Sequence, residues 1–174
     1  MWACMSDAHR TLILLRHAKS DYPDGVADHE RPLAPRGVRE AGLAGDWLRS
    51  GVVDPPVQAV LCSTATRTRQ TLARTGVDAP VQYVDRLYDA RPGDVIAEIN
   101  VVSPDVRTLL VIGHEPTMSS VALGLAGGPG TDESAARQIS QKYPTSALAV
   151  LRVPGPWSTL ELGGAALEKF HVPR

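Results

Sequence analysis

The sequence predicts an α/β domain with a largely parallel sheet. Short apolar segments and helical segments alternate from residue 11 to residue 126, which is typical of such a fold. The chain has 174 residues, enough for one domain with a sizeable core and too few for two ordinary ones. Hydrophobic residues make up 43% and charged residues 21%, the balance of a globular protein rather than of a disordered chain. We therefore expect residues 1–174 to form a single domain.

Eight segments between residues 11 and 126 have a clear periodicity. Short apolar runs bounded by polar or turn-forming residues predict buried strands. The expected strands are residues 11–15, 57–62, 81–84 and 108–112. Apolar residues spaced three or four positions apart predict amphipathic helices between them. The expected helices are residues 37–50, 64–74, 94–102 and 116–126.

Turn-forming residues predict how these segments are connected. Residues 21–36 hold three prolines and several charges without an apolar period, so we expect a long surface loop there. The Ser63 hydroxyl is placed to accept from backbone N–H groups, which predicts an N-cap for the helix at 64–74. Gly76 is predicted to end that helix.

The two ends of the chain are expected to differ from this pattern. Residues 1–10 are predicted to be a disordered lead, within which Met5 is an alternative start to Met1. Residues 127–144 are polar and contain glycine, so we expect a mobile loop. Residues 147–153 and 159–162 are expected to form a hairpin that extends the sheet at one edge.

The charge and cysteine content exclude several classes of function. Eighteen Lys and Arg residues face nineteen Asp and Glu residues, a net charge of −1 without the basic excess of general nucleic-acid-binding proteins. Cys4 and Cys62 are too few for a disulfide framework and lack the spacing of a structural zinc site. No apolar run has the length of a membrane span, and the N-terminus lacks an export pattern. We therefore expect a cytoplasmic protein with neither nucleic-acid nor membrane partners.

Basic side chains follow three of the predicted strands. Arg16 and His17 come directly after the first strand, and His114 comes after the strand at 108–112. After the second strand, Ser63 is followed one helical turn later by Arg67. Because ligands bind at the carboxyl ends of strands in an open α/β sheet, we expect these side chains to meet at one edge. The planar fork of arginine matches phosphate oxygens, so the pattern predicts a phosphate site.

Seven other basic residues are interpreted as surface groups. The histidines among them lie away from the ends of the predicted strands. Some of the others can make the mouth of the site positive, which would steer a ligand without taking part in the chemistry. The histidines assigned to the surface or a tail are His9, His29 and His171. The lysine and arginines assigned to solvated faces are Lys19, Arg36, Arg39 and Arg69.

Four segments resemble, in order, the signatures of the histidine phosphatase (phosphoglycerate-mutase-like) superfamily. Residues 15–20, LRHAKS, resemble its Arg-His-Gly signature, with Ala18 in place of the commoner glycine. Residues 33–37, LAPRG, are similar to the segment that opens the first helix of the family. Residues 63–71, STATRTRQT, resemble its second signature, and residues 111–116, VIGHEP, resemble the segment with its second histidine.

Within that superfamily, the short chain and the Arg-His-Ala-Lys-Ser form look most like the small SixA-type phosphohistidine phosphatases. The resemblance implies a three-layer α/β/α sandwich with a mostly parallel central sheet. It implies that His17 is the nucleophile and carries a covalent phosphohistidine intermediate. By position, Arg16 and Arg67 bind the phosphate together with His17, and His114 completes the pocket.

These residues suit phosphoryl transfer, which needs an in-line nucleophile and positive charge around the phosphate oxygens. Since arginine and histidine supply that charge, we expect neither a metal nor a cofactor. The carboxylate that protonates the leaving group is expected to be Asp89 or Glu115, with Asp21 as a more distant third. The expected substrates are a phosphorylated protein, above all one carrying phosphohistidine, or a small phosphate ester, and the product is inorganic phosphate. A mutase fits less well, because so short a chain has few residues for a closing lid.

Three other interpretations were weighed against this one. A cysteine-dependent phosphatase needs arginine six positions after the cysteine, but that position after Cys62 is Thr68. A two-metal phosphoesterase would use Asp7 and His9, which precede the first strand instead of following it. A non-catalytic phosphate-binding protein stays open, although an arginine pocket alone would suffice for binding without His17.

Overall fold

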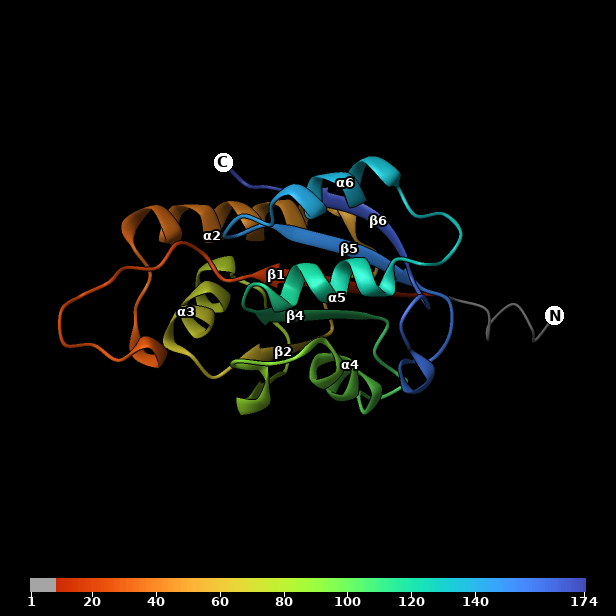
Figure 1. Cartoon of the computed structure of the whole chain (residues 1–174), viewed down its shortest axis with the longest axis horizontal. Coiled ribbons are helices and arrows are strands. Elements are labelled where there is room, and N and C mark those ends of the chain that lie inside the picture. Colours follow the sequence, from red (N-terminus) through yellow and green to blue (C-terminus); the bar gives the residue numbers. More distant parts are fainter. Residues whose placement is uncertain (1–8) are drawn as a thin grey trace.

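The strands form one mixed sheet in the computed structural model, which describes residues 9–174. Six strands lie in the order β3-β2-β4-β1-β5-β6 within that range (Figure 1). They are β1 (Arg10–Arg16), β2 (Ala59–Ser63), β3 (Val81–Val84), β4 (Thr108–Gly113), β5 (Leu148–Val153) and β6 (Ala166–His171). Strands β1 to β4 pair in parallel, and β5 and β6 are antiparallel additions at one edge. The predicted mostly parallel sheet is therefore confirmed.

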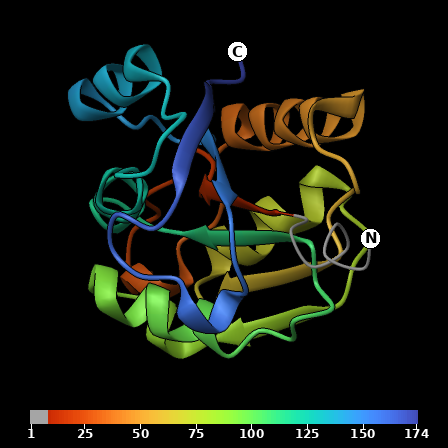
Figure 2. The same ribbon diagram turned by 90° about the vertical axis from the view of Figure 1, so that its right-hand side faces the viewer.

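Helices cover both faces of this sheet, which gives three layers (Figure 2). They are α2 (Pro35–Trp47), α3 (Thr66–Thr75), α4 (Pro92–Asn100), α5 (Thr117–Leu125) and α6 (Glu133–Gln141). Side chains of β1 point alternately to the two faces, as in any strand. Leu12 and Leu14 pack in the core with α4, α5 and α6, whereas Ile13 and Leu15 pack in the core with α2 and α3. The predicted α/β/α sandwich is confirmed.

Helices α2 and α3 approach each other closely because small residues line their contact. Ala41, Ala44 and Gly45 are buried on α2. A Cβ atom added at Gly45 would lie 1.9 Å from the carbonyl oxygen of Thr75 at the end of α3. Only glycine allows this approach, which fixes α3 and the arginine at its start relative to the sheet.

Short helical segments join the main elements. They are the 3-10 helices η1 (Asp28–Glu30), η3 (Asp85–Leu87) and η4 (Trp157–Thr159), and the π-helical turn η2 (Leu48–Val52) after α2. Segment η1 lies inside the loop predicted for residues 21–36, which extends beyond the carboxyl end of β1 (Figure 1). Across residues 9–174, no helix is long and apolar enough to span a bilayer.

The expected loop at residues 127–144 is wrong for its central part, where residues 133–141 form α6. The Asp132 side chain caps this helix by accepting a hydrogen bond from the Ala135 N–H group at 2.9 Å. Only Ala135 and Ile139 are buried along α6. Because so few apolar residues lie along this helix, its period could not be recognised within a polar segment.

The second strand of the C-terminal hairpin is also wrong, because β6 begins at Ala166 rather than at residue 159. Trp157 explains the longer connection. Its ring is fully buried, and its indole N–H donates to the Val106 carbonyl at 2.7 Å. The segment after β5 must therefore reach the core through η4 before the chain returns to the sheet.

Two expectations near the strand ends also need correction. The N-cap of α3 is Ala65, not Ser63, because Ser63 is still the last residue of β2. The lead expected over residues 1–10 is too long, since Arg10 already pairs with Val153. Met1, Cys4 and Met5 lie outside the described residues.

Candidate active site

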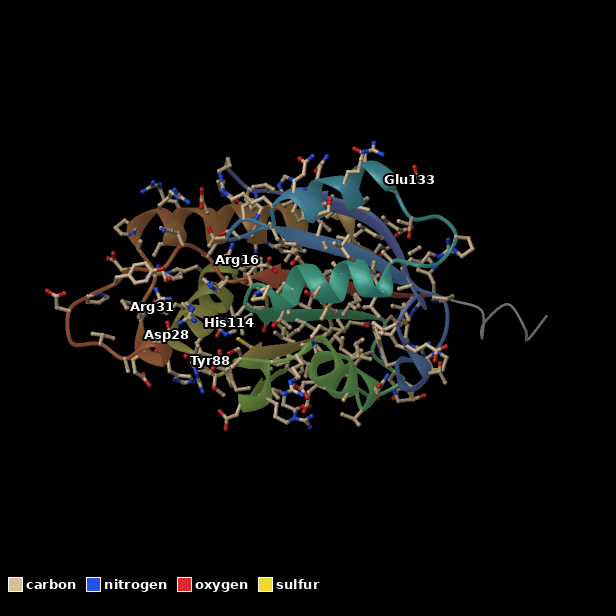
Figure 3. All side chains as sticks on the ribbon, in the orientation of Figure 1. Arg16, Asp28, Arg31, Tyr88, His114 and Glu133 are labelled. Carbon is tan, nitrogen blue, oxygen red and sulfur yellow. The ribbon has the colours of Figure 1, made fainter. Side chains whose placement is uncertain are left out.

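The register of the parallel strands brings the two candidate histidines to the same level. Arg16 of β1 pairs with Gly113 of β4, so the residues that follow, His17 and His114, leave the sheet side by side. The His17 N–H group donates to the Gly113 carbonyl at 3.0 Å, and the two imidazole centroids are 5.3 Å apart. Figure 3 shows His114 and Arg16 at the end of the molecule where these strands stop.

The backbone fixes the tautomer of His17. Its Nδ1 atom lies 2.8 Å from the Ala18 carbonyl oxygen, which can only accept a hydrogen bond. Nδ1 must therefore carry the proton, and Nε2 keeps its lone pair. The Ala18 N–H group donates to the Thr71 hydroxyl at 2.9 Å, and that hydroxyl donates to the Arg67 carbonyl. Helix α3 thus holds the turn that orients His17.

Both histidines are neutral at physiological pH. Burial, together with the neighbouring His114, Arg67 and Arg16, lowers the pKa of His17 to about 3 against the opposing effect of the Ala18 carbonyl. Burial also lowers the pKa of His114 to about 4, with Arg67 as the largest nearby charge. A neutral His17 with a free Nε2 lone pair is the state that a nucleophile requires.

His114 is oriented by Ser63. The His114 Nε2 atom lies 2.8 Å from the Ser63 hydroxyl, which also accepts a weak bond from the Ala65 N–H group at 3.4 Å. Ser63 is fully buried, and its hydroxyl proton has no other acceptor among residues 9–174, so we assign that proton to the bond with His114 Nε2, which leaves the proton of the neutral ring on Nδ1. The Ser63 hydroxyl therefore contacts His114 and does not cap helix α3, contrary to the prediction.

Arg16 and Arg67 flank the two histidines, and each is held by a backbone carbonyl. Arg16 donates from Nη1 to the Tyr143 carbonyl at 2.8 Å. Arg67 donates from Nη1 to the Asp28 carbonyl at 2.8 Å and from Nη2 to the Asp28 carboxylate at 3.2 Å. These contacts fix the direction of both guanidinium groups before any ligand binds. We call Arg16, His17, Arg67 and His114 the inner site.

Three nitrogen atoms of the inner site are buried without a hydrogen-bond partner among residues 9–174. They are Arg16 Nε, Arg67 Nε and His114 Nδ1. A buried donor without a partner is costly, so native proteins rarely leave several together. Donors on two cationic groups and one neutral imidazole are suited to a multivalent oxyanion such as phosphate.

Residues 143–146, just before β5, form hydrogen bonds to the end of β1. Ser146 adopts a left-handed backbone conformation with φ of 68°, and its N–H group lies 3.2 Å from the Arg16 carbonyl and 3.1 Å from the His17 carbonyl. The Tyr143 hydroxyl donates to the Leu14 carbonyl at 2.5 Å. Residues 143–146 thus hold the end of β1, although nothing in their sequence pattern indicated it.

Asp28, His29 and Tyr88, which we call the rim, surround the inner site on its solvent side. The Tyr88 hydroxyl donates to the Asp28 carboxylate, and the Tyr88 ring meets the His114 ring edge-on at 5.4 Å (Figure 3). His29 was predicted to be a surface residue, but its Nε2 lies 3.0 Å from the Thr64 hydroxyl and its ring meets Tyr88 at 4.8 Å. The other two surface histidines lie elsewhere: His9 is exposed, and His171 stacks on Trp47.

The three candidate proton donors differ in their burial and in their contacts with the inner site. Glu115 is half-buried near Arg16, and its carboxylate accepts from the Ser119 N–H group at 2.6 Å. Burial lowers the pKa of Arg16, and the charge of Glu115 opposes this effect. Asp89 follows Tyr88 but is exposed and adopts a left-handed backbone with φ of 55°. Asp21 is exposed on the loop before η1.

Cys62 does not belong to this site. It is fully buried on the α2 and α3 side of the sheet, and burial raises the pKa of its thiol to about 12. A thiol in that state is a small apolar side chain rather than a nucleophile. Within residues 9–174, no three His, Cys, Asp or Glu side chains are grouped to hold a metal ion.

Comparison with known proteins identifies relatives that match most of the chain. The sequence model of the histidine phosphatase superfamily (branch 1) matches residues 12–99. An uncharacterized protein of Mycobacterium tuberculosis is 65% identical over 92% of this chain and 100% of its own length. An uncharacterized chloroplastic protein of Arabidopsis thaliana is 30% identical over 94% of this chain and 78% of its own length.

Solved structures agree with this relationship. A candidate phosphohistidine phosphatase, SixA, from Nakamurella multipartitia has a TM-score of 0.85 and 40% identity over 95% of this chain and 96% of that one. A structure of the protein histidine phosphatase SixA complexed with tungstate has a TM-score of 0.74 and 23% identity, covering 94% of this chain and 97% of that one. The second likeness concerns the fold alone.

Proposed function

Because the chain belongs to the histidine phosphatase superfamily, we propose that it hydrolyses phosphohistidine in proteins through a phosphorylated His17. The observation that carries this proposal is the Nδ1 hydrogen bond of His17 to the Ala18 carbonyl. It leaves the Nε2 lone pair free on a buried ring that lies beside His114 and near the charges of Arg16 and Arg67. A site that only bound phosphate would not need an oriented, neutral imidazole.

In the first step, His17 Nε2 attacks the phosphorus atom in line with the leaving group. A P–N bond to His17 forms while the substrate P–N or P–O bond breaks, and the leaving group takes a proton. The charge on the three equatorial oxygens is met by the unpartnered N–H groups of Arg16, Arg67 and His114. Because these donors are already oriented, they need little reorganisation during the reaction.

In the second step, water attacks the phosphohistidine from the side that the leaving group has vacated. The P–N bond to His17 breaks, inorganic phosphate is formed, and His17 returns to its neutral state. The same three donors stabilise this second transition state. The arginines supply the positive charge that a metal supplies in other phosphatases, so we propose that the reaction needs no divalent ion.

We propose Glu115 or Asp89 as the group that protonates the leaving group. The half-buried position of Glu115 beside Arg16 favours Glu115, while Asp89 is exposed. A phosphohistidine substrate makes little demand on this acid, since its leaving imidazole is readily protonated by solvent. Replacement of Glu115 by Gln should therefore slow hydrolysis of an aryl phosphate more than that of a phosphohistidine protein, with Asp89→Asn as the matched comparison.

The 40% identity to the chain described as a candidate phosphohistidine phosphatase supports a protein substrate. The test is a comparison of kcat/KM on a phosphohistidine protein, a phosphoserine peptide and sugar phosphates, with and without EDTA. The proposal predicts the highest value on the phosphohistidine protein and no effect of EDTA. A preference for sugar phosphates would assign a small-molecule phosphatase, and no turnover of any substrate would assign a phosphate-binding protein.

A further inference from the structure

A single carboxylate, that of Asp28, joins three elements around the phosphate-binding Arg67. One oxygen accepts from Arg67 Nη2 at 3.2 Å and from the Tyr88 hydroxyl, and the other accepts from Arg31 Nε at 3.0 Å. The Asp28 carbonyl accepts from Arg67 Nη1 at 2.8 Å. Segment η1 is thereby tied to α3 and to the residue after η3 (Figure 3).

The two arginines of the inner site differ in what holds them. Arg16 donates to the carbonyl of Tyr143, a neutral group, and the nearby Glu115 carboxylate makes no hydrogen bond to it. Arg67 is held by a carbonyl and by a carboxylate, so a negative charge lies next to the proposed phosphate position. The Tyr88 hydroxyl, together with Arg31 and Arg67, keeps the pKa of Asp28 well below its usual range. Asp28 is therefore ionised at neutral pH.

A carboxylate next to Arg67 would help a phosphatase to release its product. Arginine and imidazole donors that stabilise the transition state also bind the inorganic phosphate that the reaction produces. Binding that is equally strong in every state does not raise the rate, and tightly held product slows turnover. A carboxylate on one edge of Arg67 would orient the guanidinium and offset part of its charge at the same time.

We propose that Asp28 is a positioning residue and the internal counter-anion of Arg67. It holds the guanidinium in the direction that phosphoryl transfer needs and lowers the affinity of the site for inorganic phosphate. This inference rests on the proposed function, because it takes the inner site to be a phosphate site. It assigns a role in product release to a residue of the loop that precedes α2.

The Asp28→Asn variant separates charge from orientation. The backbone carbonyl that binds Arg67 Nη1 stays in the variant, and the side-chain amide oxygen can still accept a hydrogen bond. The amide has one acceptor oxygen where the carboxylate has two, so the variant keeps the contacts with Arg67 and Tyr88 and loses the bond from Arg31 together with the negative charge. Because the Asp28 side chain is 56% exposed, water screens its charge, and we expect phosphate to bind roughly three- to tenfold tighter in the variant.

The experiment measures the dissociation constant of inorganic phosphate by calorimetry and its inhibition constant in aryl phosphate hydrolysis. Asp24→Asn is the matched control, because it removes the same charge from the same exposed loop without a hydrogen bond to Arg67. We expect Asp28→Asn to lower both constants about three- to tenfold and Asp24→Asn to change them by less than about 1.5-fold. Asp28→Ala also loses the side-chain contact, so its kcat should fall about tenfold while that of Asp28→Asn stays within about threefold.

Weaker or unchanged phosphate binding in Asp28→Asn would overturn the counter-anion role, because a purely structural carboxylate cannot tighten the site when removed. Equal tightening in Asp24→Asn would overturn it too, since any loop charge would then suffice. The wild-type protein separates the two proposals. If it neither binds phosphate nor hydrolyses aryl phosphates, the proposed function fails as well; if it does both, a negative result concerns Asp28 alone.

Discussion

The inner site and the rim are held around the proposed phosphate position by different physical means. His17, Arg67 and His114 expose only 7%, 6% and 9% of their surface. The strand register sets the places of the two histidines, and helix α3 sets that of Arg67. Asp28 exposes 56% of its side chain and is held by hydrogen bonds between loops. Charged groups act more strongly where water is excluded. The inner site therefore suits the chemical step, and the rim suits adjustment of affinity and orientation.

This difference predicts a large loss when an inner arginine is removed. In Arg16→Ala, one half-buried cationic donor to the proposed phosphate disappears, and we expect kcat/KM on an aryl phosphate to fall roughly a hundredfold. Arg74→Ala, which removes an exposed arginine from α3, should stay within about twofold. Similar losses in both variants would mean that total charge, and not the buried geometry, determines the rate.

The pH dependence should reveal the buried state of the inner histidines. With pKa values lowered by burial to about 3 for His17 and about 4 for His114, both rings stay neutral down to acidic pH. After correction for substrate ionisation, kcat/KM should be level from neutral pH to about pH 5 and fall only as His114 and His17 gain protons below that. A fall centred near pH 6.5, the value of an unperturbed histidine, would contradict the buried site.

A smaller effect is expected for Ser63, which contacts His114 without belonging to the inner site. In Ser63→Ala, His114 Nε2 loses its partner, while the buried ring keeps its packing. We expect kcat to fall about tenfold. Without Ser63, the ring proton of His114 can move to Nε2, and Nδ1 is then no longer a hydrogen-bond donor. Unchanged kinetics, measured in the same aryl phosphate assay, would remove Ser63 from this role.

The rim should give the smallest effect. Tyr88→Phe removes one hydrogen bond to Asp28 and keeps the ring against His114. We expect kcat/KM to change by about two- to threefold, the size typical of one exposed hydrogen bond. A loss of tenfold or more would place Tyr88 with the inner site and end the distinction between the two regions.

The same two regions differ in what the sequence could predict. Arg16, His17 and His114 could be located because each follows an apolar run with a clear strand pattern, and parallel strands end at one edge. Asp28, His29 and Tyr88 could not, because no apolar period surrounds them and their contacts join positions far apart in the chain. Asp28 meets Arg67 across 39 residues and Tyr88 across 60.

Two of the wrong assignments have a clear physical reason. Ser63 has the side chain of a good N-cap, but a tertiary partner, His114, takes its hydroxyl and the helix begins three residues later. Helix α6 buries only Ala135 and Ile139, too few apolar positions to mark a helix within a polar segment. Gly76, by contrast, has the left-handed backbone expected of a residue that ends a helix, with φ of 70°.

The proposed phosphoryl transfer to His17 is tested most directly by trapping the phosphorylated protein. The protein is mixed with a small phosphate donor, quenched at alkaline pH within milliseconds to seconds, and examined by mass spectrometry and NMR. Because the Ala18 carbonyl holds the Nδ1 proton, a single phosphoryl group should appear on Nε2 of His17 and be absent in His17→Ala. Phosphate on Nδ1, on another residue, or on no residue at all while substrate is consumed would contradict the account.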